Sequence, residues 1–65
     1  MSLPLDTRDT AILTRLAAGA SLKGIARDQN LSAYSLKMHA RIVRLKLGAR
    51  TSTEAVAIAL RRNLI

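Results

Sequence analysis

"SAYSLKMHARIVRLKLG", residues 32–48, is the stretch that decides which fold the sequence predicts. Drawn as an α-helix over residues 33–47, it carries an apolar stripe within about 60° of arc: Leu36, Ala40, Val43 and Leu47. Long, mostly basic side chains occupy an opposite arc of roughly 120°: Tyr34, Lys37, Met38, Arg41 and Arg44. Ser32 is a suitable N-cap, and Gly48 is a suitable stop. The stretch therefore predicts a helix that packs through one side and exposes a basic side.

Two shorter helices are predicted before this one. Asp6 and Asp9 stand three residues apart, as in a capping box, and predict a first helix over residues 7–18. Ser21 is a cap for a second helix, over residues 22–29. Only a few residues then separate the second helix from the opening stretch. This short connection is what a helix-turn-helix requires.

The chain after the opening stretch predicts one more helix. Thr51 and Glu54 make the clearest capping box in the sequence and predict a fourth helix over residues 52–62. Strand signals are nearly absent, because there is no Phe or Trp, one Tyr and no sustained alternation. The predicted fold is all-α, a four-helix (tetrahelical) helix-turn-helix domain over residues 6–65 behind a short tail of residues 1–5.

The charge of the chain favours a polyanionic partner. Eleven Lys and Arg residues stand against four acidic residues, which gives a net charge of +7 over 65 residues. Nucleic acid is favoured over an anionic membrane. No apolar run approaches the roughly 18 residues of a membrane span, and the N-terminus lacks the regions of a signal peptide. A cytoplasmic protein is therefore expected.

Metal, cofactor and enzyme chemistry are not expected from these residues. The chain has no Cys and a single histidine, His39, so neither disulfides nor a zinc site are predicted. No combination of nucleophile, acid and base is apparent, and His39 is expected to be structural or next to a phosphate rather than catalytic.

A series of motifs resembles one known family. "SLKMH" (35–39) stands where that family usually has Thr-Val-Lys-x-His, and "KLG" (46–48) follows at the family's spacing. The match extends without a gap over about residues 5–65. The sequence is thus similar to the DNA-binding domain of the LuxR/GerE family of bacterial transcription regulators. Ile42 and Leu45 depart from the pattern, since the family often has polar residues there.

The resemblance implies a sequence-specific transcription regulator, bacterial or phage-encoded and nucleoid-associated, that inserts its third helix into the major groove of double-stranded DNA. The expected base-contacting residues are Tyr34, Lys37, Met38 and Arg41. The expected phosphate contacts are Ser21, Lys23, Ser32, Ser35 and Arg44, because helix starts attract anions and cations attract phosphates. The alternatives are that Ser21 and Ser32 serve as caps and that Lys23 and Arg44 are solvated charges.

The fourth helix predicts a dimer because it is apolar on two sides. One side carries Val56, Leu60 and Leu64, and the other carries small or aliphatic residues that would permit close helix approach. The expected dimer contact is formed by Ala55, Ile58, Ala59 and Arg62. Family members commonly dimerise through this helix, and a two-fold dimer implies an inverted repeat as its target. The alternative is a small bundle that simply buries this helix deeply.

Two further expectations concern partners. The apolar patch of Met38, Ile42 and Leu45 would contact DNA methyl groups, a second regulator or RNA polymerase. An alternative function is therefore a small interaction protein that pairs with a larger regulator of the same family. Because only a few residues precede the first helix, a stand-alone regulator without a sensor domain is expected, with a fragment as the alternative.

Overall fold

The computed structural model describes residues 4–65, so residues 1–3 of the predicted tail lie outside it. The described residues form four helices and no strand: α1 (Thr7–Ala17), α2 (Leu22–Asp28), α3 (Ala33–Leu47) and α4 (Ser52–Arg61). The predicted all-α, four-helix fold is confirmed, and every predicted helix end lies within one residue of the observed one.

Polar caps set the starts of these helices. The side chain of each N-cap accepts a hydrogen bond from the backbone N–H three residues further on: Asp6, Ser21, Ser32 and Thr51. The capping box of α1 is complete, because Asp9 also accepts a hydrogen bond from the backbone N–H of Asp6 at 3.0 Å. At α4, Glu54 instead accepts from the backbone N–H of Arg50 at 3.1 Å. The predicted capping box at α4 is therefore only half formed: Thr51 caps the helix, whereas Glu54 binds the backbone of the preceding loop.

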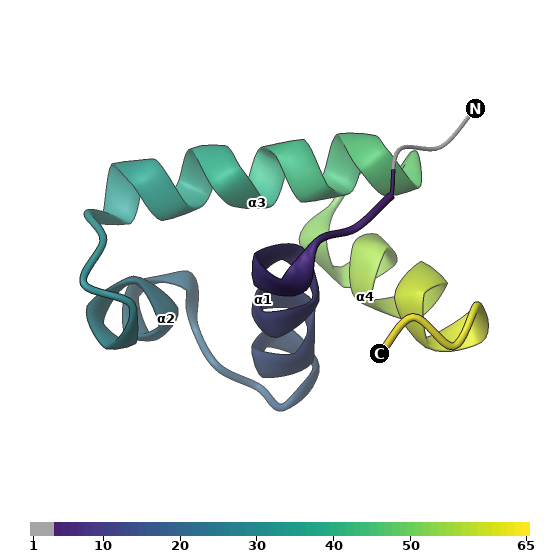
Figure 1. Cartoon of the computed structure of the whole chain (residues 1–65), viewed down its shortest axis with the longest axis horizontal. Helices are drawn as coiled ribbons and strands as arrows, with labels where there is room; N and C mark the ends of the chain where they lie inside the picture. Colours follow the sequence, from purple (N-terminus) through teal and green to yellow (C-terminus); the bar gives the residue numbers. More distant parts are fainter. Residues whose placement is uncertain (1–3) are drawn as a thin grey trace.

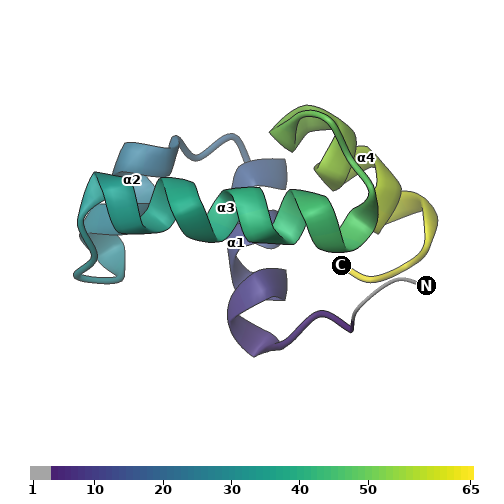
Figure 2. The same cartoon turned by 90° about the horizontal axis from the view of Figure 1, so that it is seen from above.

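α3 lies across the other three helices (Figures 1 and 2). In Figure 1, α1 is seen nearly end-on beneath the middle of α3, while α2 and α4 lie beneath its two ends. α3 contacts each of the other helices, and α1 also contacts both α2 and α4. One side of α3 is therefore packed along its length, and the other side faces outward.

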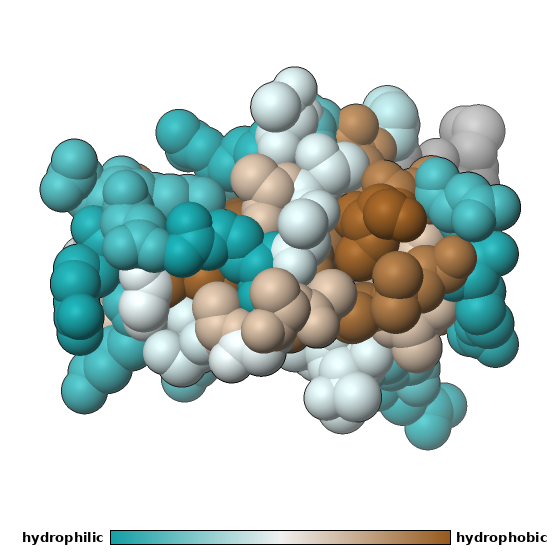
Figure 3. Space-filling view, turned by 90° about the horizontal axis from the view of Figure 1, so that it is seen from below, coloured by the Kyte–Doolittle hydropathy of each residue, from teal (hydrophilic) through white to brown (hydrophobic). Residues whose placement is uncertain are grey.

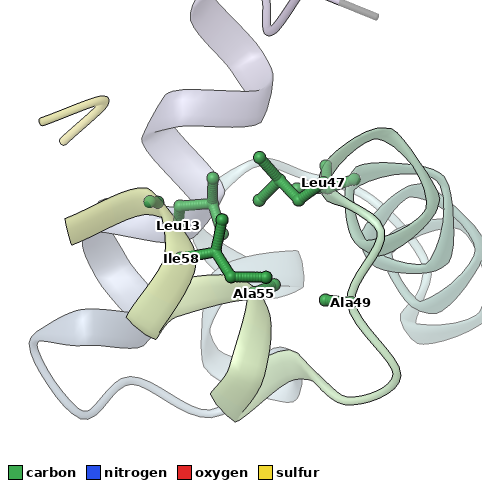
Figure 4. Packing of buried hydrophobic residues seen from close by; sticks show 7 residues of the cluster. Leu13, Leu47, Ala49, Ala55 and Ile58 are labelled. Carbon is green, nitrogen blue, oxygen red and sulfur yellow. The ribbon is translucent and has the colours of Figure 1, made fainter. Parts of the chain in front are cut away.

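Two buried clusters hold this arrangement together. The larger cluster joins α1, α3 and α4 (Figure 4): Leu13, Val43, Leu47, Ala49, Ala55, Ile58 and Ala59. The smaller cluster joins α1, α2 and α3: Ile12, Ile25, Ala26 and Leu36. The stripe of α3 that was predicted to face the core is buried along its whole length. Because the neighbours Ile12 and Leu13 enter different clusters, α1 connects the two halves of the core.

Gly48 ends α3 as predicted. It adopts the left-handed conformation with φ of 70°, which glycine accommodates without steric cost. The backbone N–H of Ala49 then donates to the carbonyl of Arg44 at 2.8 Å. This turn directs the chain from the end of α3 to the start of α4. Among the described helices, none is long and apolar enough to cross a membrane.

Candidate nucleic-acid interface

The turn between α2 and α3 fixes the relative placement of the two helices. It consists of residues 29–32, and Asn30 takes a left-handed conformation with φ of 56°. Asparagine tolerates this conformation better than most residues. The backbone N–H of Leu31 donates to the carbonyl of Ala26 at 2.9 Å, and the Leu31 side chain packs against the smaller core cluster. α2, this turn and α3 thus form the predicted helix-turn-helix.

A buried carboxylate fixes α3 on α1. Asp9 is fully buried, and its two oxygens receive hydrogen bonds from side chains 30 and 37 residues further along the chain. Lys46 Nζ donates to Asp9 Oδ2 at 2.7 Å, and His39 Nε2 lies 2.9 Å from Asp9 Oδ1. An ionised carboxylate only accepts, so His39 donates from Nε2. His39 thus has the structural role expected of it.

The charge of Asp9 is stabilised by these partners. Burial raises the pKa of the Asp9 carboxyl, but hydrogen bonds from Lys46, the Asp6 backbone and His39 outweigh burial and lower the pKa to about 2. The hydrogen bond to Asp9 raises the pKa of Lys46 in turn. Asp6, Asp9 and His39 place potential metal-ligating atoms within 4.8 Å of one another, but Lys46 already supplies the positive charge there.

The exposed side of α3 brings together the four residues predicted to contact bases. Tyr34, Lys37, Met38 and Arg41 are all exposed. Their spacing of three, four and seven residues places them on one side of the helix over roughly 10 Å. This side is opposite the buried stripe and faces away from the other helices, as the view from above shows (Figure 2). The arrangement presents a convex row with two cations and no acidic side chain.

Of the five residues predicted to contact phosphates, four are exposed: Ser21, Lys23, Ser32 and Ser35. Ser21 and Ser32 act as N-caps of α2 and α3, so their capping role is part of the structure. The Ser32 hydroxyl also donates to Ser35 Oγ at 2.9 Å. The fifth residue, Arg44, is half-buried.

Arg44 has a structural partner that sequence reasoning missed. Its Nη1 donates to the backbone carbonyl of Arg50 at 2.7 Å. The contact braces the loop between α3 and α4 from the last turn of α3. No local signal in the sequence marks it, because it depends on how Gly48 turns the chain.

The expected dimer contact must be corrected. Ala55, Ile58 and Ala59 are 1%, 8% and 0% exposed and belong to the larger core cluster (Figure 4), so a second subunit cannot reach them. The assignment of the dimer contact to these three side chains is wrong. Arg62, the fourth residue named, is exposed. The small alanine side chains allow α4 to pack closely against α1, which explains why this side of α4 faces inward.

The larger apolar side chains of α4, and Leu64 three residues beyond the end of α4 at Arg61, are at least partly exposed. Leu60 and Leu64 are 52% and 40% exposed, and Val56 is half-buried. A shallow groove of about 200 Å³ lies beside Val56 and is lined by Leu16, Ala17, Ser52 and Thr53. Figure 3, which views the molecule from the face opposite α3, shows hydrophobic side chains gathered at the α4 end. We call Val56, Leu60 and Leu64 the α4 stripe.

The fold and the exposed side of α3 define a helix-turn-helix domain of the DNA-binding class. Residues 3–59 match the family described as bacterial regulatory proteins, luxR family, also called GerE. This match covers most of the 65 residues, and the chain belongs to that family. It is a DNA-binding transcription regulator, and domains of this family are not enzymes. No curated protein and no solved structure matches the chain.

Proposed function

We propose that this regulator reads a specific DNA sequence as a homodimer, with α3 of each subunit in the major groove of an inverted repeat. The observation that carries the proposal is the division of α3 into a fully buried stripe and an exposed side bearing Tyr34, Lys37, Met38 and Arg41. The major groove is about 12 Å wide and admits one helix. A helix packed through one side only is suited to enter it.

The exposed side chains of α3 suit base edges. Lys37 and Arg41 carry donors for guanine O6 and N7, and Met38 suits a thymine methyl group. Tyr34 lies in the first turn of α3, where its hydroxyl could form a hydrogen bond with a further base edge. These contacts would specify the DNA sequence, because phosphate contacts alone carry no sequence information.

Side chains around the helix starts would hold the DNA backbone. The proposed phosphate contacts are Ser21, Lys23, Ser32, Ser35 and Arg44. Backbone N–H groups in the first turn of α3 add a partial positive charge close to Ser32 and Ser35. Arg44 has donors left after its bond to Arg50, since a guanidinium carries five N–H groups.

The α4 stripe, with Arg62 beside it, is the proposed dimer contact. α4 lies beneath one end of α3, and hydrophobic side chains gather at the α4 end of the face opposite α3 (Figures 1 and 3). Pairing at this end of that face would leave both α3 helices free for DNA. A two-fold dimer places two copies of the same helix on half-sites whose spacing mirrors its symmetry.

The test is the loss of affinity when the two cations of the row are removed. An operator is first selected from a random DNA library with the wild-type chain. Lys37→Ala and Arg41→Ala should each weaken binding to it by about 1–3 kcal/mol and relax the preference at one base pair. Arg61→Ala is the control, because it removes one exposed cation from α4. A combined loss below about 1 kcal/mol for the α3 pair would exclude them as base readers.

A second function uses the same α4 stripe for a different partner. The exposed Leu60 and Leu64 also suit pairing with the fourth helix of a larger family member, which would make this chain a modulator of that regulator. If the chain alone forms a homodimer that binds its operator at nanomolar concentrations, and pull-downs recover no protein partner, the modulator function is excluded.

A further inference from the structure

The exposed side of α3 changes chemistry along its length. Its N-terminal part carries Tyr34 and Lys37, while Ile42 and Leu45 lie further along the same side, 50% and 68% exposed. Exposed aliphatic side chains are common singly, but this pair lies one helical turn apart and continues from Met38. Nothing in the fold requires them, because the buried stripe of α3 is complete without them.

The pair continues the spacing of the proposed base-reading row. Tyr34, Lys37, Met38 and Arg41 follow the spacing i, i+3, i+4 and i+7. Met38, Arg41, Ile42 and Leu45 repeat that spacing four residues later. Homeodomains read base edges in the major groove with four residues at the same spacing on one helix. A helix that lies along the groove can therefore bring Ile42 and Leu45 to base edges together with Arg41.

The chemistry of the pair selects one feature of DNA. Isoleucine and leucine offer no hydrogen bond, and the C5-methyl group of thymine is the apolar group that the major groove displays. A protein partner fits this surface poorly, because a stable interface buries about 800 Å² per partner. Ile42 and Leu45 form a single narrow row beside the exposed cation Arg41, which instead favours a polyanion.

We propose that Ile42 and Leu45 are specificity-determining residues that contact thymine methyl groups next to the bases read by Arg41. The inference rests on the proposed function, since it requires α3 to lie in the major groove. It predicts an operator whose half-site holds one or two thymines that are preferred for their methyl groups.

Uracil substitution tests the proposal, because uracil pairs like thymine but lacks the methyl group. Each thymine of the selected operator is replaced in turn by uracil, and binding of the wild-type chain is measured. At one or two positions per half-site, uracil should weaken binding about fourfold, the value of one buried methyl group. In the Ile42→Ala/Leu45→Ala variant, the difference between thymine and uracil at those positions should vanish.

The controls separate this inference from the proposed function. Thr14→Ala, which truncates an exposed side chain on α1 outside every proposed contact, should keep the thymine preference of the wild type. Sequence-specific binding with no uracil effect at any position would overturn the inference and leave the proposed function standing. The inference would also be overturned if the Ile42→Ala/Leu45→Ala variant kept every uracil effect of the wild type, because Met38 or another residue would then contact all of those methyl groups. Absence of sequence-specific binding would overturn both.

Discussion

Asp9 is the single residue on which the placement of α3 most depends. Its carboxylate closes the capping box of α1 and also binds His39 and Lys46 of α3. The sequence predicted only the first of these roles, because a capping box is a local pattern of neighbours three residues apart. The partners on α3 are brought to Asp9 by the crossing of two helices, and no local pattern encodes that crossing.

The low pKa of Asp9 predicts a loss of stability in acid. The folded pKa is about 2, below the ordinary value of 3.8, so the carboxylate stabilises the fold fully above pH 3.8. This contribution, about 2 kcal/mol, is lost as the pH falls towards 2. Urea unfolding measured from pH 6 to pH 2 should show the free energy of unfolding fall. Loss of the Asp9 contribution should account for about 2 kcal/mol of that fall.

Two variants assign that acid loss to Asp9. Asp9→Asn should lower the free energy of unfolding by about 3 kcal/mol at neutral pH, because Lys46 and His39 lose their buried partner. This variant should also lack the part of the acid-induced loss of stability that comes from Asp9. Lys46→Met should move the acid loss to higher pH, whereas Lys37→Met, which changes an exposed lysine of the same helix, should not. An unchanged acid profile in both Asp9→Asn and Lys46→Met would contradict the assignment.

Among the helices, α3 combines two requirements at its first turn. Ser32 caps the helix by accepting from the backbone N–H of Ser35 at 3.0 Å, and the same residue is a proposed phosphate contact. Aspartate and serine are comparably good N-caps, but only aspartate carries a negative charge. The two roles of Ser32 can therefore be separated by substitution.

Ser32→Asp should retain stability and lose DNA affinity. Thermal unfolding should be nearly unchanged, while operator binding should fall by about tenfold or more, because the new charge would face a phosphate. Ser32→Ala should lose about 1 kcal/mol of stability, and its operator affinity should fall less than that of Ser32→Asp, because it removes a phosphate contact without adding a negative charge. Thr51→Asp is the matched control, since it places the same charge at the cap of α4. Equal operator affinities for Ser32→Asp and Thr51→Asp would exclude a phosphate at Ser32.

The sequence predicts the ends of α4 correctly but not which side of the helix is exposed. The sequence shows that α4 has two apolar sides, and it predicts a dimer contact through the side that carries Ala55, Ile58 and Ala59. Burial follows the space between the packed helices: the small Ala55 and Ala59 share the larger core cluster with Leu13 of α1, whereas Leu60 is exposed. Hydrophobicity alone ranks Leu60 above Ala59 as a core residue and therefore misleads here.

At the scale of the whole molecule, the two exposed apolar groups lie on different faces. Figure 3 shows hydrophobic side chains at the α4 end of the face opposite α3, whereas the exposed side of α3 lies on the other face. The caps and the buried stripe of α3 could be predicted because they are local and periodic. Which of the remaining apolar residues face outward could not, because that depends on how all four helices meet.

The separation of the two faces predicts which one governs assembly. Leu60→Glu/Leu64→Glu should convert a dimer to a monomer in sedimentation experiments and weaken binding to the inverted repeat about a hundredfold. Ile42→Glu/Leu45→Glu changes another exposed aliphatic pair, on α3, and should leave the mass in solution unchanged. A wild-type mass in the first variant, or a halved mass in the second, would contradict a dimer through the α4 stripe.

The division of α3 into a buried stripe and an exposed side also bears on how the regulator changes over evolutionary time. Leu36, Ala40, Val43 and Leu47 hold the helix, whereas the residues that would read DNA take no part in the core. Mutations on the exposed side are therefore free of the usual penalty of lost packing. Substitutions at those positions can therefore change the target site without loss of core packing.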